Sequence, residues 1–180
     1  MPLLVDRMMR AARLDPVLYD EAARDEGTMD HAIASVVISS VAAGIGSSLL
    51  GGPIGLIGGT LAALVGWFIW AFTAHFVGTR FLAEPGTRAD LAPVLRAVGF
   101  AAAPGVLRVF GIIPLLGTLA NFVANLWMLA AFVVAVRRSL GYTSTGRAVA
   151  VCLIGFVMQM IVFGLFTLMV LGGAFLTFAR

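Results

Sequence analysis

Side chains that could support chemistry are few in this chain and lie far apart in the sequence. The 180 residues include two histidines, His31 and His75, and one cysteine, Cys152. Catalysis needs a nucleophile with a base, or several metal ligands, within reach of one another. The two histidines flank the same apolar block, so a metal site near its ends is conceivable but poorly supplied with ligands. We therefore predict no catalytic residue, no cofactor-binding residue and no metal ligand.

Carboxylates concentrate near the N-terminus. Six of them lie between residues 15 and 30: Asp15, Asp20, Glu21, Asp25, Glu26 and Asp30. Paired carboxylates can bind divalent cations, but the ligand spacing of an EF-hand loop is absent. We interpret this cluster as a solvated helix face.

Other polar residues interrupt apolar sequence. Asn121 and Asn125 follow Gly117 at intervals of four residues, which places the three on one helix face. In lipid such amides hydrogen-bond across helices or line a polar pathway, and we favour the first role. Arg96 and Arg108 bracket Pro104, and this pair is where we expect any functional polar feature within the membrane.

Composition defines the elements that would position these residues. The chain is 61% hydrophobic and 12% charged, with a mean hydropathy of +1.03. Residues 32–78, 109–136 and 148–179 contain no Asp, Glu, Lys or Arg. Uncharged apolar blocks of this length are typical of transmembrane helices. The sequence predicts an all-α, polytopic integral membrane protein with five transmembrane helices.

The predicted spans follow from block length and turn residues. A single helix over residues 32–78 would be about 70 Å long, against a hydrocarbon core of about 30 Å. Gly51-Gly52-Pro53 should therefore form a turn. The predicted spans cover residues 32–50, 54–78, 91–111, 115–136 and 148–179. Residues 91–111 are the weakest of these, because Pro104-Gly105 interrupts them and a re-entrant segment is the alternative.

The first thirty residues are predicted to form a cytoplasmic region, separate from a membrane domain over residues 31–180. Residues 3–14 fit an amphipathic helix, lying in the membrane interface or packed on the loops of the same protein. We favour the interface. Asp15 is a candidate N-cap and Pro16 a first helical residue, followed by a helix over residues 17–30.

Small and aromatic residues indicate how the first two spans pack. Gly51, Gly55 and Gly59 recur every fourth residue, which permits close helix approach. We favour packing within the chain over homodimerisation. Trp67 and Trp70 fit the aromatic belt at the cytoplasmic interface.

The twelve arginines orient the chain, which has no lysine. With five spans, ten fall on the side of the N-terminus: Arg7, Arg10, Arg13, Arg24, Arg80, Arg88, Arg96, Arg137, Arg138 and Arg147. Only Arg108 and Arg180 fall on the other. This asymmetry predicts a cytoplasmic N-terminus and an external C-terminus. If residues 91–111 do not span, the balance falls to about seven or eight against four or five, which favours five spans.

Several short motifs resemble those of bacterial Yip1-domain proteins. They include Leu95-Arg96-Ala97-Val98-Gly99-Phe100-Ala101, Pro104-Gly105-Val106-Leu107, Ile113-Pro114-Leu115-Leu116-Gly117 and Gly146-Arg147-Ala148. The resemblance implies a cytoplasmic N-terminal region followed by five membrane helices. It supplies no active-site residues. The Asp-Leu-Tyr-Gly-Pro signature of eukaryotic trafficking members is absent, so the resemblance does not support a vesicle-trafficking role.

Three classes of function follow from these features. We favour a non-enzymatic scaffold or adaptor of membrane organisation or protein recruitment. A small solute or ion transporter or channel is the alternative, and a membrane enzyme has the least support. The expected partners are the lipid bilayer and either further copies of this chain or other membrane proteins. Nucleic acid is not expected, because the arginines form no binding stripe. The expected location is a cell membrane, specifically the bacterial cytoplasmic membrane.

Overall fold

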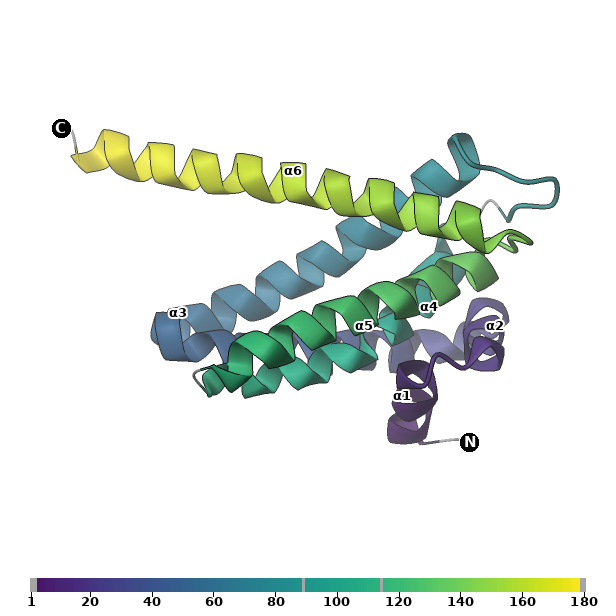
Figure 1. Ribbon diagram of the computed structural model, residues 1–180, viewed down its shortest axis with the longest axis horizontal. Helices are drawn as coiled ribbons and strands as arrows, with labels where there is room; N and C mark the ends of the chain where they lie inside the picture. The colour runs from purple at the N-terminus through teal and green to yellow at the C-terminus, as the bar shows by residue number, and fades with distance from the viewer. Residues whose placement is uncertain (1–2, 89, 114, 179–180) are drawn as a thin grey trace.

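The molecule is built from helices that run back and forth along one long axis (Figure 1). The computed structural model describes residues 3–88, 90–113 and 115–178, with the backbone alone for residues 47–56, 59, 62, 162–163, 165–167 and 169–178. This part of the chain is helical and contains no strand, as the all-α prediction requires. Pro114, between the third and fourth predicted spans, and the terminal Arg180 lie outside the described residues.

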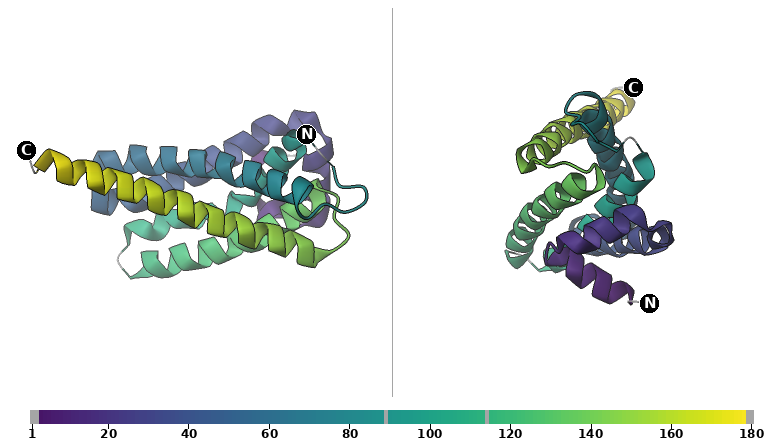
Figure 2. Two further views of the ribbon diagram at one scale, coloured as in Figure 1. Left: turned by 90° about the horizontal axis from the view of Figure 1, so that it is seen from above. Right: turned by 90° about the vertical axis from the view of Figure 1, so that its right-hand side faces the viewer.

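The helices follow one another with short connections. They are α1 (Leu4–Ala12), α2 (Pro16–Arg24), the 3₁₀ turn η1 (Glu26–Thr28), α3 (Met29–Arg80), α4 (Leu91–Ala101), the 3₁₀ helix η2 (Ala103–Ile112), α5 (Leu116–Ser139) and α6 (Thr145–Phe178). Seen end-on, α1 and α6 lie at opposite edges of the bundle (Figure 2).

Two helical segments are long and apolar enough to cross a membrane, Glu26–Gly46 and Leu116–Ser139. Among the residues with described side chains, α4 and η2 form a third candidate if the pair counts as one span bent by 42°. Thr145–Ile161 of α6 is apolar but shorter. The described residues therefore contain two or three candidate spans, and five spans remain a prediction.

α3 differs from the prediction of two separate helices. It is helical without interruption over 52 residues, which would be about 78 Å if straight. Yet the Thr60 hydroxyl lies 3.4 Å from the Ser40 carbonyl oxygen, so the helix doubles back on itself (Figure 1). These two residues are equally far from residue 50, next to the predicted Gly51-Gly52-Pro53 turn. Gly and Pro in a helix permit such a bend without ending it, since the φ of proline is itself helical.

The first half of α3 packs closely along α4 and η2. Glycines of α4 and η2 recur every sixth residue and meet small residues of α3 that recur every seventh. The pairs are Gly99 with Ala32, Gly105 with Ser39 and Gly111 with Gly46. Two turns take about six residues in a 3₁₀ helix and about seven in an α-helix, so Gly105 and Gly111 of η2 stay in register with Ser39 and Gly46. This contact fixes the path of α4 and η2.

The N-terminal region forms two short helices in place of the longer predicted ones. Asp15 caps α2 as predicted, because its carboxylate accepts a 3.0 Å hydrogen bond from the Val17 amide. α2 ends at Arg24 because the Asp25 side chain accepts from the Gly27 amide and starts the 3₁₀ turn. α3 then begins at Met29.

Burial is uneven along the bundle. Leu18, Tyr19, Phe100 and Leu140 are fully buried where α2, α4 and α5 meet. Large apolar side chains on the outer parts of α5 and α6 are exposed, including Phe122 (65%) and Met160 (62%). Apolar surface of this extent is typical of contact with lipid. The fully packed part of the bundle thus lies beside the N-terminal helices.

We predict that Gly46→Ala destabilises the protein by about 1–3 kcal/mol, the usual cost of overpacking. A Cβ at Gly46 would collide with the carbonyl oxygen of Arg108 on η2, which forces the two backbones apart. Thermal unfolding in detergent measures the effect. Gly58→Ala is the matched control, because a Cβ there meets no atom within 4 Å. Equal melting temperatures for the two variants would contradict the packing described above.

Candidate functional site

The break between α4 and η2 interrupts an apolar helical segment with a bend of 42°. Pro104 has no backbone N–H, so the α-helical hydrogen-bond pattern cannot continue through it. The Ser39 hydroxyl of α3 donates a 2.6 Å hydrogen bond to the Ala102 carbonyl, and the Gly105 amide donates another at 2.8 Å. Serine commonly satisfies backbone groups freed at such breaks in membranes. The chain continues as a ten-residue 3₁₀ helix, which is unusually long.

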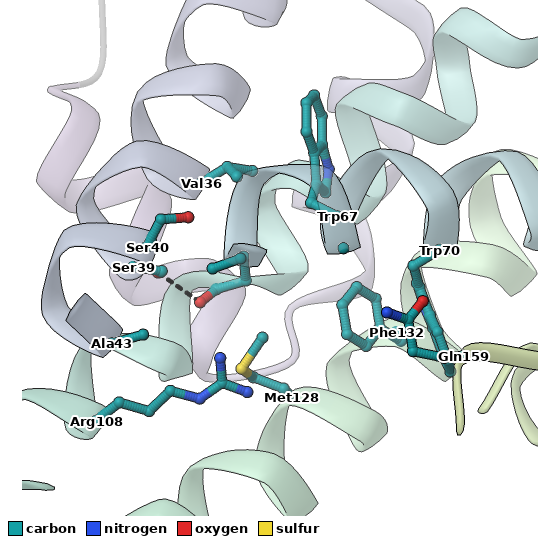
Figure 3. Close-up of a pocket in the computed structure, with 13 residues that line it drawn as sticks. Val36, Ser39, Ser40, Ala43, Trp67, Trp70, Arg108, Met128, Phe132 and Gln159 are labelled. Carbon is teal, nitrogen blue, oxygen red and sulfur yellow. Dashed lines mark hydrogen bonds between the residues drawn. The ribbon is translucent and has the colours of Figure 1, made fainter. Parts of the chain in front are cut away.

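A cavity of about 410 Å³ lies beside this break (Figure 3). Four helical elements line it with their side chains. Ser39 and Ser40 come from the first half of α3, Trp67 and Trp70 from its returning half, Arg108 from η2, Met128 and Phe132 from α5, and Gln159 from α6. The site therefore assembles residues from distant parts of the sequence.

Several polar atoms of this cavity have no partner. The indole nitrogens of Trp67 and Trp70 and the side-chain oxygen of Gln159 are buried and form no hydrogen bond with the described residues. A buried polar group left without a partner costs about 1–3 kcal/mol. The walls of the cavity thus hold two donors and one amide oxygen that lack a partner.

Arg108 brings a permanent positive charge to the same place. Its Nη2 donates a 2.5 Å hydrogen bond to Oδ1 of Asn125 on α5. The guanidinium also borders a second cavity of about 410 Å³ lined by Phe122, Leu126 and Phe156. No Asp or Glu occurs in the sequence after Asp90. The membrane domain around Arg108 therefore offers it a neutral amide and no carboxylate.

Arg96 has a different role from its predicted partner Arg108. It is 5% exposed, and its Nε and Nη2 donate to the carbonyls of Ala22 and Ala23 at 2.8 and 2.7 Å. These carbonyls belong to the last turn of α2, which has no further helical partners for them. Arg96 therefore binds the N-terminal region to α4, and it does not join Arg108 in one site.

Ion pairs hold the acidic cluster in place. Arg10 contacts Asp15 at 2.8 Å and Glu21 at 3.0 Å, and Arg138 of α5 contacts Asp20 at 3.1 Å. Partial burial opposes ionisation of Asp15, but the hydrogen bonds from Arg10 and from the Val17 amide outweigh it and lower its pKa. These acids are thus partly paired with arginine, where the sequence predicted a solvated face.

Glu84 joins the two loops at the same end of the molecule. Its carboxylate accepts from the Thr143 hydroxyl at 2.7 Å, the Thr143 amide at 2.9 Å and the Ser144 amide at 3.3 Å. Arg147 lies 3.5 Å away. The Thr143 hydroxyl bond is the main cause of the lowered pKa of Glu84. The loop between α3 and α4 is thereby tied to the start of α6.

The predicted polar residues are only partly brought together. Asn125 makes the expected bond to another helix, whereas Asn121 bonds the Gly117 carbonyl of its own helix at 2.8 Å. His31 lies 2.8 Å from Arg7. Among the described residues there is no group of three His, Cys, Asp or Glu side chains that could hold a metal ion.

The two tryptophans are the main correction. The sequence placed Trp67 and Trp70 in the interfacial belt, but both line the cavity, and Trp70 is only 8% exposed. Trp70 packs against Phe132 with ring centroids 5.2 Å apart. Their spacing of three residues, which places them on one helix face, and the isolated Gln159 were the signals that could have indicated this site.

Comparison with known proteins identifies the family. A family model described as the Yip1 domain matches residues 27–166, more than three quarters of the chain. The match includes α3, α4, η2, α5 and the packed part of α6. No curated protein and no solved structure shows significant similarity. The chain belongs to the Yip1 family, and with its apolar helices it is a membrane protein.

We predict that Arg96→Gln loosens the N-terminal region from the membrane domain. Loss of hydrogen bonds from a charged side chain to buried carbonyls costs about 1.5–3 kcal/mol. Limited proteolysis with a nonspecific protease in detergent should cut α1 and α2 faster in this variant. Arg24→Gln, at an exposed position of α2, is the control and should be cut at the wild-type rate. Unchanged protection in Arg96→Gln would refute the role given to Arg96.

A second prediction concerns acid stability. The pKa of Glu84 is lower in the folded protein than in the unfolded chain. The ionised carboxylate therefore contributes fully to the free energy of unfolding above the unfolded pKa, and this contribution is lost as pH falls through the folded pKa. Between about pH 5 and pH 3 the melting temperature of the wild type should fall more steeply than that of Glu84→Gln. Other carboxylates, such as Asp15, are present in both proteins and change their stability with pH to the same extent. Parallel pH profiles would show that Glu84 does not tie the loops.

Proposed function

We propose that this Yip1-family protein is a non-enzymatic scaffold or adaptor that crosses a cell membrane five times. The N-terminus lies in the cytoplasm and the C-terminus outside, and the bacterial cytoplasmic membrane is the expected location. Support for this orientation comes from the ten-to-two distribution of arginines. In this arrangement the ion-paired end of the bundle, with α2, faces the cytoplasm, and α1 lies against α5 at Trp127.

The observation that carries the proposal is the docking of the N-terminal region. Besides the Arg96 contacts, Trp127 of α5 donates a 2.7 Å hydrogen bond to the Ala12 carbonyl at the end of α1. Arg138 of α5 pairs with Asp20 of α2. Together with His31, which contacts Arg7, these membrane-domain residues hold α1 and α2 at defined positions. A platform fixed in this way suits recruitment of a partner better than a loose tail does.

Exposed side chains of α1 and α2 give this platform an apolar surface. Leu3 is 78% exposed, Val5 63%, Met9 51% and Val17 58%. Arg13 is also exposed on the same short region. Apolar residues beside arginines fit a helix that lies in the membrane interface or binds a partner protein there.

A solute or ion transporter is the second candidate, because the cavity adjoins a broken helix. Transporters commonly bind substrates at such breaks near the middle of the membrane. Proton-coupled carriers usually keep a titratable residue there, but the proposed spans contain no Asp or Glu. Ion or solute flux in reconstituted vesicles would favour this candidate over the scaffold.

The scaffold is tested by photo-crosslinking in native membranes. A photoreactive residue at Val17 should yield one defined protein adduct, either a partner or a second copy of this chain. The same residue at Phe156, which is 51% exposed on α6, is the control and should label mainly lipid. A chain that stays monomeric and without adducts at Val17 would refute the scaffold.

A further inference from the structure

We propose that the cavity beside the α4–η2 break binds the phosphate group of an anionic amphiphile. This proposal is independent of the scaffold, because it concerns the interior of the membrane domain and not α1 and α2. It rests on the charge of Arg108, the unpartnered polar atoms around it and the apolar second cavity.

The positive charge of Arg108 would be stabilised by a bound anion. Guanidinium stays protonated in proteins, and a cation within a membrane domain is costly unless it is paired. Asn125 supplies one neutral acceptor, and the sequence contains no acid after Asp90. The guanidinium has five N–H donors in a planar fork that matches two phosphate oxygens. A bound anion would complete this site.

The unpartnered atoms favour phosphate over a planar carboxylate. The indole N–H groups of Trp67 and Trp70 are donors only, and they reach the cavity from a different helix than Arg108 does. Trp70 is more than nine-tenths buried, so water has little access to it. A ligand that bonded both Arg108 of η2 and an indole of α3 would need several oxygens in different directions, which a tetrahedral phosphate has and a planar carboxylate lacks. Gln159 of α6 could accept from a hydroxyl of the ligand, as Figure 3 shows its amide beside Trp70.

The second cavity supplies room for an apolar chain. It shares Trp70, Arg108, Met128 and Phe132 with the first cavity, so the two adjoin. Its other walls include Leu126, which is 60% exposed, and Phe156. These side chains face the surface that lipid covers in a membrane. A ligand with its phosphate on Arg108 could therefore extend its chain toward the bilayer.

The test uses the full-length protein in phosphate-free maltoside micelles. Three probes separate the contribution of the phosphate to binding from that of the acyl chains. They are dioleoyl phosphatidic acid, dioleoylglycerol with the same chains and no phosphate, and inorganic phosphate. Bound lipid is counted by native mass spectrometry, and tryptophan emission reports binding, since two of the three tryptophans line the cavity. We expect one phosphatidic acid per chain, with dioleoylglycerol and inorganic phosphate each at least tenfold weaker.

Variants test which residues bind the phosphate. Arg108→Gln should weaken phosphatidic acid roughly tenfold or more, since a charged hydrogen bond is lost. Trp70→Phe keeps the ring, removes the N–H and should weaken binding severalfold. Should Arg108→Gln fail to fold, Arg108→Lys and Trp70→Phe still provide the test. Arg24→Gln, at an exposed position of α2, is the control and should bind as the wild type does.

Three results would overturn the proposal. If dioleoylglycerol bound as tightly as phosphatidic acid, the cavities would bind the apolar chains and not recognise the phosphate. Equal binding of inorganic phosphate would show that the ligand is the free ion. Wild-type affinity for phosphatidic acid in folded Arg108→Gln and Trp70→Phe would place the lipid elsewhere on the protein.

Discussion

The close approach of α3 to α4 and η2 is the contact on which the rest of the membrane domain depends. Glycines at positions 99, 105 and 111 allow backbone contact that larger residues would prevent. At the centre of this contact Ser39 bonds the Ala102 carbonyl, where Pro104 breaks the helix. The bend thus has a partner on α3, and the change to a 3₁₀ helix keeps the small residues of the two helices in register. Without this contact the broken segment would have no fixed path.

The same contact creates the polar interior of the protein. Because η2 turns away from α4, Arg108 lies between α3 and α5 beside a cavity that the returning half of α3 and α6 complete. On the other side of the break, Arg96 reaches α2 and fixes the N-terminal helices. One bent segment therefore connects two features, the docked platform at one end and the charged cavity within the bundle.

The sequence predicted well what depends on composition and local rules. Apolar blocks gave the helices, and Asp15 was recognisable as a cap because capping depends on neighbouring residues. Features that depend on contacts between distant residues were missed. Trp67 and Trp70 suit an interfacial belt as well as a cavity until the path of α6 and α5 is known. Arg96 resembled a charge flanking a span, since nothing local indicates that carbonyls 73 and 74 residues away would bind it.

We infer that α4 and η2 cross the membrane as one broken span, which is the basis of the five-span topology. It is tested most directly by labelling single cysteines with a membrane-impermeant maleimide in right-side-out vesicles, in a Cys152→Ser background. Leu115→Cys, at a residue 89% exposed just after η2, should be labelled from outside. Ser144→Cys, between α5 and α6, should be labelled only after permeabilisation. Labelling of Leu115→Cys only after permeabilisation would show that the segment returns to the cytoplasmic side, and would contradict the account.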